Sequence, residues 1–228
     1  MKYYIANPEL DRQIKEIRAK IRLSMNGIVS DQMTQNGIIY KKNYGVDIPR
    51  IKEISKLYAP NHDLAQRLWN LKIRETMIMA TLLEPVDKFT EEIAQEWAES
   101  FNQIEIVEQA GMNLFSKLPY ATSLSLKWIH SDKMWMQISG YIVAARVSPK
   151  FNQNETAEIV QNALKSAATN ELHLYKAIAL CLSRCCRNSK EAATYILKEI
   201  DAFSQSPSIA QRYIYSEVKQ EILFLNIL

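Results

Sequence analysis

The sequence predicts an all-α protein in which paired antiparallel helices form an α-solenoid with a concave face. First, its 228 residues include only 5 glycines and 7 prolines, fewer turn-forming residues than a β-rich chain of this size needs. Second, apolar residues recur at intervals of three and four along most of the chain, as they do in amphipathic helices. Third, the breaks between these segments span only a few residues, so neighbouring helices are expected to run antiparallel.

Proline, asparagine and glycine mark the first helices. Asn7-Pro8 is typical of a helix N-terminus, because asparagine caps helices and proline fits their first turn, and this helix is expected to continue to about Met25. Gly27 and Gly37 bracket a short second segment. The next helices are predicted over residues 50–58, from residue 61 onward and over 73–83.

Helix pairs follow through the rest of the chain. The predicted pairs are 61–71 with 73–84, 88–100 with 103–117, 119–130 with 133–147, 153–169 with 171–187, and 189–204 with 207–225. Each pair is about 30 to 40 residues long, a period that suits a HEAT-like repeat. We therefore expect residues 1–228 to form a single HEAT-like domain, with a compact non-repeat helical bundle as the alternative.

Composition places the chain among ordinary globular proteins. Hydrophobic residues make up 47% and charged residues 23% of the sequence. No apolar run approaches the roughly 20 residues that span a bilayer, and the N-terminus lacks the apolar core of a signal peptide. A cytoplasmic location without membrane contact is expected.

Charge is distributed unevenly. The net charge is +3, but residues 1–56 carry 11 Lys/Arg against 6 Asp/Glu, residues 57–132 carry 6 against 11, and residues 133–228 carry 11 against 8. Binding to phosphates needs local rather than global positive potential, so the two basic ends are compatible with a DNA-binding surface. Scattered solvated helix faces explain the same pattern equally well.

Cysteine and histidine give no metal-binding pattern. Cys181, Cys185 and Cys186 lie within one predicted helix and are expected to be small core residues. His62, His130 and His173 lie far apart and are expected in loops or on the surface. The glycine-rich loops typical of nucleotide sites and the nucleophile elbow of serine hydrolases are missing from the sequence. No metal or cofactor is expected.

Several segments of the chain resemble, in order, the motifs of one protein family. Residues 44–50 (YGVDIPR) resemble the family's Gly-aliphatic-x-x-Pro segment. Residues 68–70 (LWN) with the following Arg74-Glu75 resemble its next repeat. Residues 127–137 (KWIHSDKMWMQ) resemble a Lys-Trp-x-x-Ser-Asp-x-x-Trp-x-Gln motif, and residues 176–178 (KAI) resemble a further signature. Over roughly residues 35 to 200 the chain thus resembles the HEAT-repeat alkylpurine DNA glycosylases (the AlkD-like DNA alkylation repair family).

The resemblance implies excision of N3- and N7-alkylated purines from duplex DNA. The cationic base is already a good leaving group, so a carboxylate beside the sugar stabilises the oxocarbenium-like charge. Glu108 stands where the family's catalytic Asp is found, and Glu105 stands at its partner position. Independently, their spacing of three places both carboxylates on one helix face, which is also what a plain solvated face would show.

The chain departs from the family pattern at several positions. Ile104, Ile138, Leu180 and Ser183 stand where the family has Trp, Arg, Trp and Arg, respectively, and Arg184 lies one residue beyond the last of these. Two hypotheses follow. In the first, the chain is an alkylpurine DNA glycosylase. In the second, it is a non-catalytic HEAT-like module that binds nucleic acid or a protein partner. A purely structural helical scaffold is a third reading.

The candidate DNA-binding residues are basic, aromatic or amide side chains near helix ends. Trp135, with its neighbours Lys133 and Gln137 at a helix start, is the tryptophan expected to face a partner. Lys41, Lys42 and Arg50 surround a predicted helix N-terminus that suits phosphate. Lys176 and Arg184 complete the predicted set.

Overall fold

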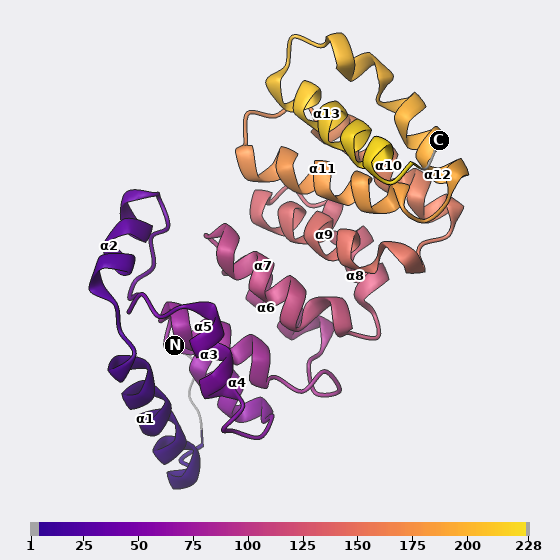
Figure 1. Ribbon diagram of the computed structural model, residues 1–228. Coiled ribbons are helices and arrows are strands. Elements are labelled where there is room, and N and C mark those ends of the chain that lie inside the picture. Colours follow the sequence, from indigo (N-terminus) through magenta and orange to yellow (C-terminus); the bar gives the residue numbers. More distant parts are fainter. Residues whose placement is uncertain (1–4, 227–228) are drawn as a thin grey trace. The chain divides into compact units, whose positions relative to one another are not determined.

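A computed structural model describes residues 5–226 of the chain (Figure 1). Within these residues the chain forms 13 α-helices and no β-strand, and one isolated parallel bridge joins Lys42 to Ile73. The helices are α1 (Pro8–Leu23), α2 (Gly27–Gln35), α3 (Ile48–Ser55), α4 (His62–Asn70), α5 (Arg74–Leu83), α6 (Glu91–Glu99), α7 (Ile104–Asn113), α8 (Ala121–Ile129), α9 (Met134–Val147), α10 (Gln153–Ser166), α11 (Leu172–Cys186), α12 (Lys190–Glu199) and α13 (Ile209–Phe224). Three short 3₁₀ helices, η1 (Phe115–Lys117), η2 (Ser148–Lys150) and η3 (Asp201–Gln205), follow α7, α9 and α12. The predicted all-α class is confirmed.

Polar caps fix most helix starts where the sequence places them. The side chain of Asn7 accepts a hydrogen bond from the backbone N–H of Leu10, and Pro8 is the first residue of α1. Asn26 and Asp47 cap α2 and α3 in the same way. Helix α3 ends at Ser55 rather than at the predicted Tyr58, because Leu57 and Tyr58 close turns onto Ile54 and Ser55 instead of continuing the helix.

Two compact units divide the chain between Ile93 and Ala94, within α6. The single domain expected over residues 1–228 stays a prediction. In the first unit, α1 packs on α3 and α4, and α5 packs on both α3 and α4. The hydrophobic core of this unit includes Ile17, Leu64, Trp69 and Ile78.

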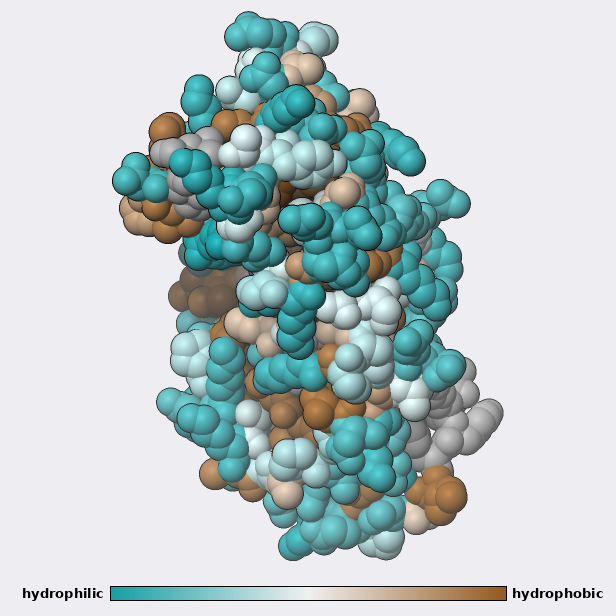
Figure 2. All heavy atoms as spheres, turned by 90° about the vertical axis from the view of Figure 1, so that its right-hand side faces the viewer, coloured by the Kyte–Doolittle hydropathy of each residue, from teal (hydrophilic) through white to brown (hydrophobic). Residues whose placement is uncertain are grey.

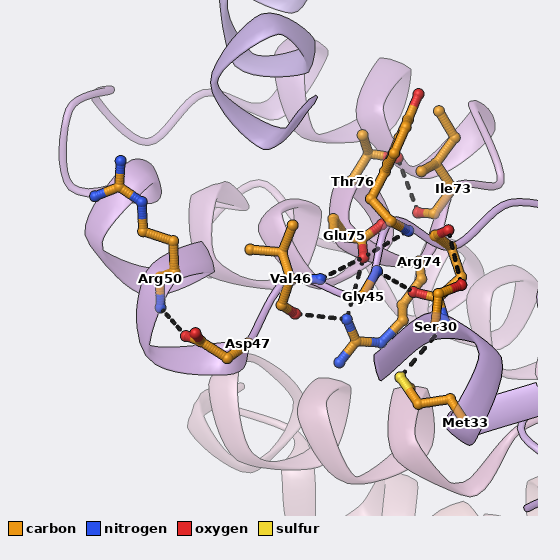
Figure 3. A network of polar contacts seen from close by, with 12 residues as sticks. Ser30, Met33, Gly45, Val46, Asp47, Arg50, Ile73, Arg74, Glu75 and Thr76 are labelled. Atoms are coloured by element: carbon orange, nitrogen blue, oxygen red, sulfur yellow. Dashed lines mark hydrogen bonds and ion pairs between the residues drawn. The ribbon is translucent and has the colours of Figure 1, made fainter. Parts of the chain in front are cut away.

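A buried ion pair connects α5 to the segment before α3 (Figure 3). Arg74 and Glu75 are 3% and 0% exposed, and Nη1 of Arg74 lies 3.2 Å from Oε1 of Glu75. The same carboxylate oxygen accepts backbone N–H bonds from Tyr44 and Val46, and Nη1 of Arg74 donates to the carbonyl of Val46. Because burying a charge is costly unless it is paired and hydrogen-bonded, these bonds hold residues 44–46 against α5.

The second unit consists of two layers of helices. Helices α7, α9, α11 and α13 pack one on the next, and Figure 1 shows them stacked side by side. In the other layer α10 contacts α8 and α12, while α8 packs on α9. This alternation of helix pairs is HEAT-like, as the sequence predicts.

Large buried side chains fill the space between the two layers. Trp97, Trp128, Phe115 and Tyr141 are almost fully buried, and the Tyr141 hydroxyl donates a hydrogen bond to Oδ1 of Asn162 at 2.7 Å. Cys181, Cys185 and Cys186 are buried free thiols, as expected of core residues.

Hydrophilic side chains predominate on the face that Figure 2 shows, with single apolar side chains between them. No helix in residues 5–226 is both long and apolar enough to span a membrane.

Candidate functional site

Three neighbouring helices of the second unit each carry two solvent-accessible polar or aromatic side chains on one side, and each such pair is called the stripe of its helix. On α7 the stripe contains Glu105 and Glu108, one turn apart. On α9 it contains Trp135 and Arg146, and on α11 it contains His173 and Arg184. Both of these pairs are eleven residues apart, about three helical turns, so the two members lie on one side of their helix. Since α7, α9 and α11 pack in sequence, the stripes are adjacent.

Glu108 is the electrostatic centre of this surface. It is exposed, yet the neighbouring helices remove part of its hydration, and this partial burial raises the pKa of its carboxyl group. The positive charges of Arg146 and His173 act in the opposite direction, while Glu105 adds to the increase in pKa. The structure therefore brings the two predicted carboxylates together with two cationic or protonatable side chains.

Arg146 acts on Glu108 electrostatically, and α7 and α9 approach closely at Gly111. A Cβ atom on Gly111 would lie 2.9 Å from Cγ2 of Ile142 and 3.8 Å from Nε of Arg146. Partial burial lowers the pKa of the Arg146 guanidinium, Glu108 opposes this change, and the positive charge of Arg184 reinforces it. Arg146 thus lies between the carboxylate on α7 and the arginine on α11.

Trp135 packs against His173 across the α9–α11 contact. The ring centroids are 5.8 Å apart, with an interplanar angle of 31°. Trp135 is half-buried, whereas the other three tryptophans are buried in the cores. An aromatic surface therefore lies beside the charged cluster.

The remaining predicted residues of the second unit are placed differently. Nζ of Lys133 lies 2.8 Å from Oε1 of Glu99, and this hydrogen bond lowers the pKa of Glu99. The Gln137 amide nitrogen donates to the carbonyl of Ile129 and to Oγ of Ser166, so it joins the start of α9 to its neighbours. Lys176 is exposed on α11.

Lys41, Lys42 and Arg50 belong to the first unit. Lys41 and Lys42 are exposed, and Nζ of Lys42 lies 4.9 Å from the centroid of the Tyr44 ring. Asp47 already caps α3 through the backbone N–H of Arg50 (Figure 3). The Arg50 guanidinium donates to Glu53 and Ser24. The phosphate-binding role of these three residues stays a prediction.

Arg146 and His173 are not among the residues that the sequence predicts for the site. The eleven-residue spacing from Trp135 to Arg146, and from His173 to Arg184, is the signal that identifies them. Residues 5–226 contain no group of three or more His, Cys, Asp or Glu side chains that would hold a metal ion.

Comparison with known proteins gives a family and a fold. The model of the DNA alkylation repair enzyme family matches residues 5–213. One similar solved structure belongs to a new family of proteins related to the HEAT-like repeat DNA glycosylases with affinity for branched DNA structures. It covers 94% of this chain and 95% of its own, with a TM-score of 0.78 and 13% sequence identity.

A second solved structure, of an engineered protein, covers 77% of this chain and 84% of its own, with a TM-score of 0.42 and 13% identity. The comparison with curated protein sequences found no match. The family match extends over nearly the whole chain, from α1 into α13. The chain therefore belongs to the DNA alkylation repair enzyme family.

Proposed function

We propose that the chain binds duplex DNA on the surface formed by α7, α9 and α11 and excises N3- or N7-alkylated purines. The observation that supports this most directly is that Arg146 and His173 act electrostatically on Glu108. Trp135 packs against the same His173. A carboxylate among cationic donors on an accessible surface suits a reaction in which positive charge moves from base to sugar.

In the proposed reaction the protein mainly stabilises charge on the sugar, because the cationic base is already a good leaving group. In a cationic N3- or N7-alkylpurine, the bond between C1′ and the base nitrogen breaks with its electron pair going to the base, which neutralises the base. The sugar becomes oxocarbenium-like, and the Glu108 carboxylate stabilises this charge. Water then attacks C1′ and passes a proton to Glu108 or to solvent. Arg146 favours the ionised form of Glu108, the form that this step uses.

The other predicted residues would position the duplex. Lys176 and Arg184 are on the same helix as His173, and Lys133 lies at the start of the helix that bears Trp135. Contacts of this kind with phosphates fix the orientation of the duplex rather than its sequence. Lys41, Lys42 and Arg50 are proposed to add phosphate contacts from the first unit.

The test is release of free base from methylated duplex DNA. Wild-type protein is expected to liberate 3-methyladenine or 7-methylguanine, and Glu108→Gln is expected to lower the rate at least about a hundred-fold, as removal of one transition-state-stabilising group does. Glu171→Gln is the matched control, because Glu171 is an exposed carboxylate just before α11 and does not cap it with its side chain. Equal rates in wild type and Glu108→Gln would refute the assigned role.

A non-catalytic role in DNA binding is the second candidate. Two positions at which the related glycosylases have tryptophan are filled by Ile104 and by Leu180, which is 37% exposed. The similar fold of a protein with affinity for branched DNA supports binding to DNA junctions. Well-folded protein that releases no base but binds a four-way junction more tightly than a linear duplex would favour this second function.

A further inference from the structure

A cavity of about 680 Å³ lies at the C-terminal ends of α9 and α11, within the second unit. Arginines contribute most of its hydrogen-bond donors, namely Arg146, Arg184 and Arg187. Ser116, Ser148 and Asn188 supply further polar groups, and none of the residues that line the cavity is acidic. Such a cavity is complementary to an anion.

Two of these arginines, Arg146 and Arg184, form no ion pair within residues 5–226. In the part of the chain that the structure describes, no carboxylate oxygen lies within 4.0 Å of a guanidinium nitrogen of Arg146 or Arg184. Arg184 is half-buried, and its positive charge lowers the pKa of Arg146. Basic residues in the last turn of a helix interact favourably with the helix dipole, which explains Arg146 at the end of α9 and Arg184 at the end of α11. It does not explain why three arginines line one cavity, of which only Arg187 forms an ion pair within residues 5–226.

Arg187 is held in a defined orientation. Its Nε donates to the carboxylate of Glu221 on α13. This bond uses one edge of the guanidinium, and both terminal nitrogens remain without a partner among residues 5–226. Asn188 is held as well, because its amide nitrogen donates to the carbonyl of Ser148 at 2.7 Å. Pre-oriented donors of this geometry bind phosphate with little ordering cost.

We propose that this cavity is a phosphate-binding site, in which Arg184 and Arg187 contact one phosphate group of the bound DNA. This inference rests on the proposed function and extends it to a phosphate contact separate from the Glu108 carboxylate. Arg146 adjoins both sites, because it interacts with Glu108 on one side and lines the cavity on the other. Glu221 bonds Nε of Arg187 rather than its terminal nitrogens, but its negative charge lowers the positive potential of the cavity.

The test is a scan of neutral methylphosphonate substitutions along each strand of a duplex, with affinity measured for each position. In wild-type protein, the substitution at the contacted phosphate is expected to weaken binding about ten-fold, which is the loss of one charge-assisted contact. In the double variant Arg184→Gln/Arg187→Gln the same substitution is expected to have no further effect. The slope of log K against log salt is expected to become shallower by about 0.9, the value for one phosphate.

Two further variants make the outcome specific. Lys198→Gln removes an exposed charge on α12 and is expected to leave the methylphosphonate profile unchanged. Glu221→Gln removes this negative charge and is expected to tighten DNA binding a few-fold, an increase that a folding defect cannot produce. That increase is expected to disappear when the contacted phosphate is a methylphosphonate.

Duplexes with and without a 5′-terminal phosphate separate the two sources of the group. A loss of affinity on substitution at an internal position identifies a phosphodiester, and a loss of affinity at the end identifies a strand terminus.

If every such loss of affinity persists in the double variant while wild-type protein binds DNA, the proposed cavity contact is wrong and the proposed function stands. If wild-type protein binds no DNA, the proposed function fails. Titration of inorganic phosphate, followed by the NMR signals of Arg184 and Arg187, then tests the cavity alone, and unchanged signals would refute it.

Discussion

Replacing Gly140 with alanine tests how closely α8 and α9 pack. Gly140 lies in the interior of α9, and a Cβ atom there would be 2.6 Å from the backbone nitrogen of Ile129 and 2.8 Å from the carbonyl carbon of Trp128. Both atoms belong to the backbone of α8, so no side-chain rotation relieves the clash. The two helices must move apart.

The size of the effect follows from these distances. Ordinary van der Waals contact begins at 3.4 Å, so the displacement needed is 3.4 − 2.6 = 0.8 Å. Overpacking of this kind costs about 1–3 kcal/mol, and a gap of 0.5–1 Å forfeits a quarter to a half of the dispersion energy of the contacts it opens. The higher helix propensity of alanine relative to glycine stabilises the folded state by about 1 kcal/mol. Subtracting this gain from the overpacking cost leaves an expected net loss of about 1 kcal/mol in the free energy of unfolding.

Urea denaturation followed by circular dichroism measures this loss. Gly27→Ala is the control, because no atom lies within 4 Å of the added Cβ, and its free energy of unfolding is expected to stay the same or rise by less than about 1 kcal/mol. Base release is also expected to fall, because α9 bears Trp135 and Arg146. A Gly140→Ala protein within about 0.5 kcal/mol of wild type would show that α8 and α9 tolerate separation and would refute the reasoning.

Three further predictions concern ionisable and buried groups. Because burial raises the pKa of Glu108 and the ionised form is the active one, the rate of base release should rise with pH through that pKa. Arg146→Gln should move the inflection of the profile to higher pH, and Glu105→Gln should move it to lower pH. Coincident profiles of the three proteins would contradict the assignment. Glu75→Gln leaves Arg74 buried without its charged partner and should cost about 3–5 kcal/mol in urea unfolding, whereas a loss below about 1 kcal/mol would show the pair to be unimportant. Burial raises the pKa of the Cys186 thiol to about 12. The hydrogen bond that the Cys181 thiol makes to Cys185, followed by burial, raises the pKa of Cys181 well above its usual value. The folded protein should therefore leave 5,5′-dithiobis(2-nitrobenzoate) unreacted, and fast labelling of any thiol before denaturation would disprove this.

Most of the fold could be predicted from the sequence because its signals are local. Asn7-Pro8 acts within one helical turn, and the structure places a cap there. Apolar spacing likewise predicts which face of a helix is buried. The ion pair of Arg74 with Glu75 could not be predicted in this way, because its partners are the backbone groups of residues 44–46, about thirty positions earlier.

The site was predictable only in part. Glu105 and Glu108 are visible as a pair because they are one turn apart on one helix. Arg146 and His173 act on Glu108 from two other helices, so their role depends on how three helices pack, and at Gly111 the missing side chain lets α7 approach Ile142 and Arg146 of α9. Gln137 shows the opposite case, because a polar residue at a helix start is engaged in holding helices together.

The eleven-residue stripes on α9 and α11 have a consequence for how such a protein evolves. The residues between the stripe positions form the buried faces of these helices, such as Ile138, Tyr141, Ala177 and Cys181. Stability and chemistry therefore depend on different positions of the same helix. A mutation in a stripe exchanges one solvent-facing side chain for another and leaves the packed layer intact. Lineages can thus change the accessible side chains of these helices on one unchanged scaffold.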